Sequence, residues 1–230
     1  MHILVIDGGH VETEFREKFG PGHGYTFLNS ELNESADFWT GSEQLGKKAI
    51  AGAGAVFQFG RGVTPDYLAN ATGLPLFVDT SCGELPAFFA ETYLLFGFCG
   101  LPSLLNRHLL EVSLCREADR EKLAATCVAL GTDYRVVADR VGLVTPRVVC
   151  MVINEACYTV QEGTATMQDV DLGMRLGTGY PRGPFAWANA IGVARVHAVL
   201  DALWHDTHDE RYKICPLLKR QAQRGEPFAV

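Results

Sequence analysis

The sequence lacks several features that mark particular protein classes. Its 230 residues include seven cysteines but no CxxC pair, and no Cys/His spacing suits zinc. It has no apolar run long enough to cross a membrane, and the opening MHILVI is too short for the apolar region of a secretory signal. We therefore expect a cytoplasmic protein with reduced thiols, no metal and no membrane association.

Positive charge is also scarce. The chain has 20 Lys and Arg against 27 Asp and Glu, which gives a net charge of −7. Because binding to a phosphate backbone needs clustered Lys and Arg, we expect no nucleic-acid partner. Hydrophobic residues make up 47% and charged residues 20%, as in ordinary globular proteins, and the length allows one large core or two small domains.

The first half of the chain alternates short apolar stretches with helical patterns. Such alternation predicts a parallel sheet with helices on its faces. Strands are predicted at 2–6, 25–28, 55–59, 76–79, 96–101 and 134–138, and helices at 11–19 and 117–130.

From Val141 onward the pattern becomes helical. Thr145 and Pro146 fit the cap and the first position of a helix, and apolar residues then recur at helical spacing as far as Val160. A Gly/Pro loop is predicted at 177–184, and further helices at 166–176, 193–203 and 217–223. The chain is thus predicted to have an α/β domain at 1–140 and an all-α domain at 141–230.

Five motifs of the second half occur together in one known family. DRVGLVTPR, INEA, QEGTAT, DVDLGMRLGTGYPRGPF and CPLLKRQ follow one another with nearly that family's spacing. Residues 142–224 therefore resemble the C-terminal domain of 3-hydroxyacyl-CoA dehydrogenases. The resemblance implies a shortened Rossmann-like sheet domain that binds NAD, followed by a helical dimerisation domain of the 6-phosphogluconate dehydrogenase C-terminal type. It also implies a homodimer formed through the helical domain, and NAD-linked oxidation of 3-hydroxyacyl-CoA in fatty-acid β-oxidation.

The resemblance extends upstream and implies site residues there. VDTSCGELP places Ser81 at a substrate-orienting serine, and HLLEV places Glu111 at the family's catalytic glutamate. Cys99 then stands where the family has its catalytic histidine, and Pro146 where it has an orienting asparagine. A thiol beside a carboxylate is a poor base, and a proline offers no hydrogen-bond donor. Ser81 could equally be a turn residue, and Glu111 a solvated carboxylate at a strand end.

The opening MHILVIDGGHVETEF resembles a dinucleotide-binding start. Its three fingerprint positions read Asp7, Gly9 and Glu12, so two carboxylates would face the pyrophosphate. The candidate cofactor residues are Gly8, Gly9 and Glu31. Glu31 falls where the family's ribose-binding acid is expected, although the residues before it fit a strand end equally well.

These departures leave three hypotheses open. The first is a catalytically impaired family member that acts as a dimeric scaffold or binds acyl-CoA. The second is an active NAD-dependent 3-hydroxyacyl-CoA dehydrogenase in which His108 or Cys99 replaces the base. The third is a nucleophilic site formed by Cys99, Glu111 and Ser81, which no motif supports. We favour the first, because a missing general base alone removes about 10²–10⁴-fold in rate.

Overall fold

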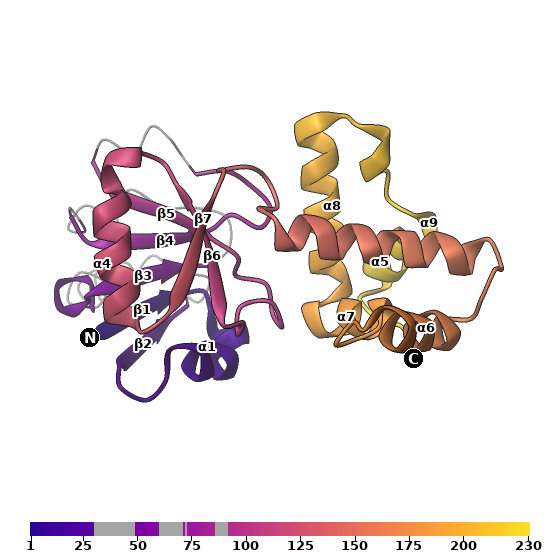
Figure 1. Cartoon of the computed structure of the whole chain (residues 1–230), viewed down its shortest axis with the longest axis horizontal. Coiled ribbons are helices and arrows are strands. Elements are labelled where there is room, and N and C mark those ends of the chain that lie inside the picture. Colours follow the sequence, from indigo (N-terminus) through magenta and orange to yellow (C-terminus); the bar gives the residue numbers. More distant parts are fainter. Residues whose placement is uncertain (30–48, 60–70, 72, 86–91) are drawn as a thin grey trace, which may run out of the picture. The chain divides into compact units, whose positions relative to one another are not determined.

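The computed structural model describes residues 1–29, 49–59, 71, 73–85 and 92–230, and its contacts divide the chain into two units (Figure 1). The first, which we call the sheet unit, comprises Met1–Thr80, Glu84–Gly100 and Leu105–Arg140. The second, the helical unit, comprises Ser81–Gly83, Leu101–Leu104 and Val141–Val230.

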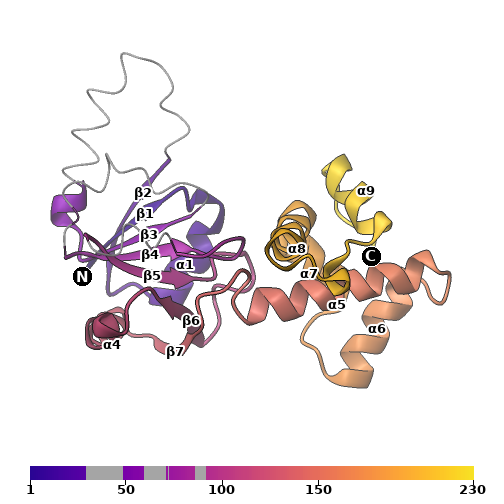
Figure 2. The ribbon, with the colours of Figure 1, turned by 90° about the horizontal axis from the view of Figure 1, so that it is seen from above.

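The sheet unit is built on a seven-stranded sheet in the order β2-β1-β3-β4-β5-β6-β7 (Figure 2). Strands β1 to β5 are parallel, β6 is antiparallel to β5, and β7 is parallel to β6. The chain changes direction across the sheet between β1 and β3, whose carboxyl ends form the point where such sheets bind ligands. The strands are β1 (His2–Ile6), β2 (Gly24–Leu28), β3 (Ala55–Gln58), β4 (Pro75–Asp79), β5 (Leu94–Phe98), β6 (Leu109–Leu114) and β7 (Asp133–Val137).

Two described helices cover one face of this sheet. The helix α1 (Glu12–Phe19) follows the 3₁₀ turn Gly9–Val11, and α4 (Arg120–Leu130) follows the 3₁₀ turn Glu117–Asp119. Both bury apolar side chains in the same cluster as Phe57 and Phe77, whose ring centroids lie 4.5 Å apart. Alternate residues of β1 belong to a second cluster, so the strand is buried on both faces, as is usual in parallel sheets.

The helical unit contains α5 to α9 and the 3₁₀ turn Glu210–Tyr212. Gly192, with φ +99°, separates α7 from α8 and allows the chain to bend between them. Its core includes Ile153, Phe185 and Leu200. The helices are α5 (Thr145–Gln161), α6 (Met167–Thr178), α7 (Pro184–Ile191), α8 (Val193–Thr207) and α9 (Pro216–Arg224). No helix of the described residues is long and apolar enough to span a membrane.

The predicted fold class of a mainly parallel sheet followed by helices is confirmed. Strand 2–6 is correct at both ends, and four more strands agree to within one residue. The strand expected at 96–101 is instead Leu94–Phe98, and β6 and α7 were not predicted. The prediction of Thr145 as a helix cap was wrong, because Val144 occupies that position and Thr145 is already helical.

Candidate functional site

The loop after β1 keeps the turn of a dinucleotide-binding start without its first glycine. Asp7 has φ +58°, in the left-handed region that residues other than glycine rarely adopt. Its backbone N–H donates to the carbonyl of Leu28 at 2.8 Å, which holds the turn against β2. Asp7 therefore makes the sharp bend for which the fingerprint normally uses glycine.

The next two residues, both candidate cofactor residues, have different environments. A Cβ atom on Gly8 would lie 2.5 Å from Val5 Cγ1 and 2.7 Å from Phe59 Cδ2, so this glycine is required for packing. Gly9 is exposed, and a Cβ atom there would meet no described atom within 4 Å. Of the two, only Gly9 offers open backbone. Glu31 lies outside the described residues.

The start of α1 does not fit a dianionic pyrophosphate. Within the 3₁₀ turn, the N–H of Val11 donates to Gly8 O at 3.1 Å and that of Glu12 donates to Gly9 O, so two amides are already used. The first helical turn carries the carboxylates of Glu12 and Glu14, and Glu12 pairs with Arg16 at 2.8 Å. Both residues belong to the first turn of α1, at the positive end of the helix dipole, so their negative charge disfavours a phosphate there.

The structure brings Cys99 and Glu111 together. Because β5 and β6 are antiparallel and Phe98 pairs with Val112, these two residues follow directly as neighbours at the edge of the sheet. Both are buried, and Glu111 is only 6% exposed as the third residue of β6. The alternative of a solvated strand-end carboxylate is therefore wrong. Glu111 Oε2 lies 3.6 Å from Arg107 Nη2, so the two side chains form an ion pair.

Ser81 and Pro146 both fall in the helical unit. Ser81 is buried in the turn that follows β4. Pro146 is buried in the first turn of α5, where its missing N–H costs no helical hydrogen bond. This position agrees with a structural role for Pro146, and its side chain cannot orient a substrate oxygen.

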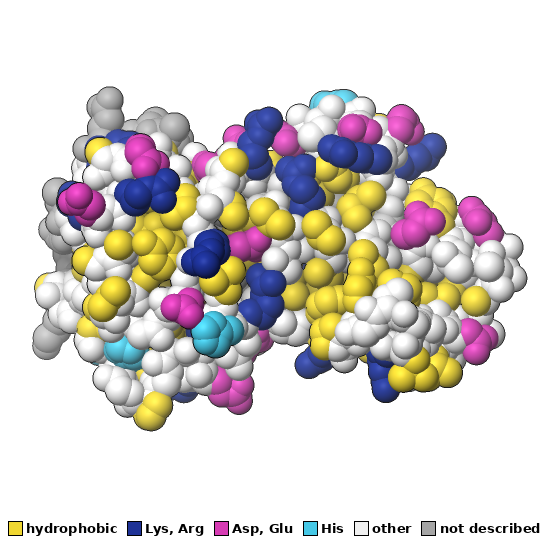
Figure 3. Space-filling view, in the orientation of Figure 1, with side chains coloured by type: hydrophobic (Ala, Val, Ile, Leu, Met, Phe, Trp, Pro, Cys, Tyr) yellow, Lys and Arg dark blue, Asp and Glu magenta, His cyan; other side chains and the backbone are white. Residues whose placement is uncertain are grey.

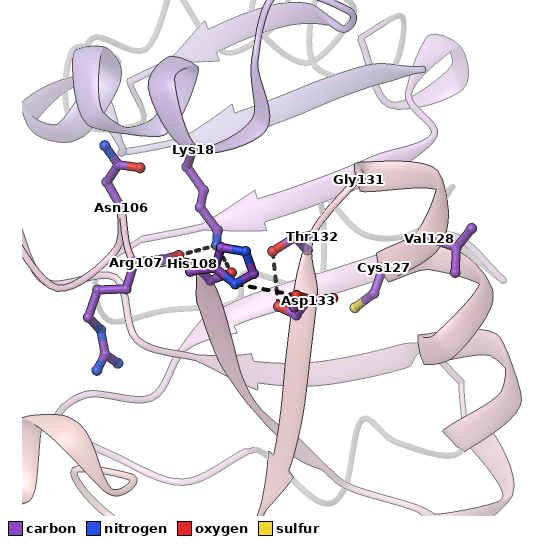
Figure 4. A pocket seen from close by; sticks show the side chains of 9 residues that line it. All are labelled: Lys18, Asn106, Arg107, His108, Cys127, Val128, Gly131, Thr132 and Asp133. Atoms are coloured by element: carbon purple, nitrogen blue, oxygen red, sulfur yellow. Dashed lines mark hydrogen bonds and ion pairs between the residues drawn. The ribbon is translucent and has the colours of Figure 1, made fainter.

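His108 lies in a different environment from Glu111. Its Nδ1 lies 3.3 Å from Asp133 Oδ2, and its side chain is 89% exposed. It lines a polar pocket together with Lys18 from α1 (Figure 4). His108 is thus paired with Asp133, whereas Glu111 is paired with Arg107.

The longest motif of the helical unit is explained by one buried carboxylate. Asp171 accepts hydrogen bonds from the N–H groups of Phe185 at 2.7 Å and Ala186 at 2.9 Å, and so caps the start of α7. A Cβ atom on Gly183 would lie 2.2 Å from Asp171 Cγ, so only glycine fits there. The DVDLG and YPRGPF parts of the motif are therefore complementary halves of one structural contact.

Other polar residues of the motifs hold backbone segments in place. Asn154 donates to Lys213 O and accepts from Cys215 N, both at 2.9 Å. Asn189 makes the same kind of paired contact with the backbone of Phe228, at 2.9 and 2.7 Å. The structural roles of Asp171, Asn154 and Asn189 were not predicted from the sequence. The available signal was a polar residue within an otherwise apolar helix face, which is costly unless it is hydrogen-bonded.

No cluster of His, Cys, Asp and Glu in the described part of the chain has the geometry to hold a metal ion. The seven cysteines all lie in the described residues, and none of them forms a disulfide. The described residues thus provide a buried Cys99–Glu111 pair and an acidic loop at the switch point of the sheet.

Comparison with known proteins gives matches that centre on the helical unit. Residues 142–227 match the family model of the 3-hydroxyacyl-CoA dehydrogenase C-terminal domain. The 3-hydroxyadipyl-CoA dehydrogenase of Escherichia coli is 44% identical over 86 residues, which are 37% of this chain and 18% of that protein. The 3-hydroxybutyryl-CoA dehydrogenase of Bradyrhizobium diazoefficiens is 32% identical over 109 residues, which are 47% and 36% of the two chains. The matched segments therefore span well under half of these relatives.

The fold of the whole chain also has solved counterparts. The crystal structure of (S)-3-hydroxybutyryl-CoA dehydrogenase from Ralstonia eutropha aligns with 97% of this chain and 94% of its own, with a TM-score of 0.68. The sequence identity is 20%, so this likeness concerns the fold alone.

Proposed function

This chain belongs to the 3-hydroxyacyl-CoA dehydrogenase family through its helical unit, and on that premise we propose that it is a catalytically impaired member that binds acyl-CoA as a homodimer. The observation that carries this proposal is the acidic loop at the switch point. Asp7 and Glu12 occupy two fingerprint positions, and the amides of Val11 and Glu12 are bonded within the turn. Such a loop repels the pyrophosphate on which the family's hydride transfer depends.

The part of the sheet that carries Cys99 and Glu111 supports the same proposal. A histidine at position 99 could exchange a proton with a substrate hydroxyl and be oriented by Glu111, whereas Cys99 is a buried thiol. A thiol must lose its own proton before it can accept one, so Cys99 is a poor general base. The motifs of the helical unit are kept, and their polar residues make structural contacts.

The ligand class follows from the named relatives. The proteins from Escherichia coli and Bradyrhizobium diazoefficiens are dehydrogenases of 3-hydroxyadipyl-CoA and 3-hydroxybutyryl-CoA. We assign a CoA thioester to this chain as its ligand, without the oxidation step.

The homodimer rests on apolar side chains left exposed on the helical unit. On α6, Leu172 is 51% and Leu176 is 74% exposed, and these residues are one helical turn apart. Val144 and Val148, at the start of α5, are exposed in the same way. Hydrophobic side chains gather on the face of the helical unit in Figure 3. A second copy of the chain would remove this surface from water.

A second candidate function is an active NAD-dependent dehydrogenase with a replaced base. Two observations favour it. Asp7 retains the left-handed turn of the fingerprint, and Gly9 leaves open backbone beside it. In this case Cys99 or His108 would accept the proton.

The two candidates are separated by assaying the purified chain with acetoacetyl-CoA and NADH. We expect no NADH consumption above the enzyme-free rate, together with saturable acetoacetyl-CoA binding by calorimetry. Enzyme-dependent NADH consumption would establish the second candidate, and the variants Cys99→Ser and His108→Gln would then identify the base. Absence of acyl-CoA binding would reject the proposed ligand.

A further inference from the structure

A polar pocket of about 390 Å³ lies within the sheet unit, between α1, the loop before β6 and the turn that joins α4 to β7 (Figure 4). The pocket is lined by side chains that the proposed function does not use, chiefly Lys18, His108, Thr132 and Asp133. In Figure 4 the Lys18 side chain extends from α1 toward the His108 ring, and Asp133 lies beside that ring.

Lys18 is held in the pocket by the backbone. Its Nζ donates to the carbonyl oxygens of Arg107 and of His108, the latter at 3.1 Å. An ammonium group has three N–H donors, so one remains for another acceptor. The side chain is partly buried, and burial together with the charge of Arg107 lowers the pKa of the Lys18 ammonium. An anion bound beside Lys18 would stabilise the charged ammonium against both burial and the repulsion by Arg107.

The loop that supplies these carbonyls is fixed to α1. The N–H of Asn106 donates to Glu14 Oε1 at 2.8 Å, and its side-chain amide donates to Glu17 Oε2 at 2.9 Å. These contacts, with those of Lys18, hold the wall of the pocket in one arrangement. The pocket is therefore formed before any ligand arrives, which reduces the entropy cost of binding.

The charges around the pocket favour an anion. Lys18 and Arg107 are cations, and Asp133 is the single acidic residue in the lining. Because Nδ1 of His108 faces Asp133 at 3.3 Å, Nε2 is the ring nitrogen available to a ligand. Because Arg107 is paired with Glu111, we expect it to act on a ligand through its charge and not through a direct hydrogen bond.

We propose that this pocket binds a small oxyanion, a phosphate or a carboxylate, through the Lys18 ammonium and the His108 ring. The proposal does not rest on the proposed function, because none of the loop residues at the switch point takes part; His108 recurs only as a candidate base of the alternative function. Phosphate is expected to bind more tightly than acetate, since it carries more charge near neutral pH and the lining has a net positive charge. Cys127 also lines the pocket, but burial raises the pKa of its thiol to about 12, so it does not act as a nucleophile.

The test is thermal unfolding of the whole chain in increasing inorganic phosphate or sodium acetate, with ionic strength held constant by NaCl. We expect phosphate to raise the unfolding temperature saturably, because a ligand that binds only the folded state stabilises it. The variant His108→Gln should raise the phosphate concentration at half-saturation about tenfold, the effect of losing one hydrogen bond to the charged phosphate. Its exposed side chain makes misfolding of this variant unexpected.

Arg135→Gln is the matched control, because Arg135 is an exposed cation on β7 that does not line the pocket. It should leave the phosphate response unchanged. Tighter binding of acetate than of phosphate would assign the site to carboxylates. No saturable response to either anion, or an equal loss in both variants, would overturn the proposal.

Discussion

A side chain on Gly8 would collide with Phe59, because a Cβ atom there would lie 2.7 Å from Phe59 Cδ2. A Cβ atom on Gly100 would lie 2.8 Å from Phe59 Cδ1, so the ring is packed between two glycines at the carboxyl edge of the sheet. The Phe59 side chain is buried in the core cluster that also contains Phe15 and Phe98. Gly8 is thus retained for packing, while the positions that serve a pyrophosphate carry Asp7 and Glu12.

Gly8→Ala should therefore destabilise the protein by about 1–3 kcal/mol, the usual cost of inserting a methyl group into a packed core. Gly9→Ala is the matched control, since a Cβ atom there meets no described atom within 4 Å. It should change the free energy of unfolding by no more than about 0.5 kcal/mol. Urea unfolding of both variants measures the difference, and equal losses would show that Phe59 does not restrict position 8.

Asp171→Ala should destabilise the helical unit by about 3 kcal/mol, because two N–H groups at the start of α7 lose a charged acceptor. Asp169→Ala removes a carboxylate from the same helix, where Asp169 and Thr166 cap an exposed turn. That control should lose less than about 1 kcal/mol. Similar losses for the two variants in urea unfolding would contradict the role assigned to Asp171.

Stability should fall at alkaline pH partly because of Cys127. Burial raises the pKa of this thiol from 9.0 to about 12 in the folded protein. The stabilisation is complete below pH 9 and is lost as pH rises toward 12, because the unfolded thiol ionises first. In urea unfolding from pH 8 to 10.5, Cys127→Ala should show a shallower decline than the native chain. Val128→Ala, at an exposed position of the same helix, should keep the native slope.

Leu176→Arg should convert the proposed homodimer into monomers, because it places a charge on the exposed apolar face of α6. Val128→Arg on α4 is the control, since Val128 is 80% exposed on the sheet unit. Light scattering of the purified chains measures their mass. A native chain that is monomeric, or a control that dissociates equally, would remove the support for a dimer through α6.

Local sequence patterns predicted most of the strands, because the residues that define each pattern are close together in the chain. His2–Ile6 is an apolar run that ends at Asp7, and the structure gives the same bounds for β1. In β6, Glu111 and Ser113 interrupt the apolar pattern, so the strand was not predicted. The contact that accommodates Ser113 is distant in the chain, since Asp139 accepts from its hydroxyl at 2.8 Å. Glu111 pairs with Arg107, only four residues before it, but that pairing leaves no apolar pattern to recognise.

The candidate site was predictable only in part. The spacing of the motifs predicted Cys99 and Glu111 as site residues, and the structure brings them together across β5 and β6. The sequence could not indicate that Phe59 packs against Gly8, because the two residues are far apart in the chain and meet only through the pairing of β1 with β3. The pocket beside Lys18 depends in the same way on α1 meeting the loop before β6.

The most direct test of the account is calorimetric titration of the purified chain with NADH. The acidic loop predicts no saturable heat of binding, while Asp7→Gly combined with Glu12→Gly should restore measurable binding by removing both carboxylates. Saturable binding of NADH to the native chain would contradict the proposal that this chain does not bind a dinucleotide, and would favour the active dehydrogenase.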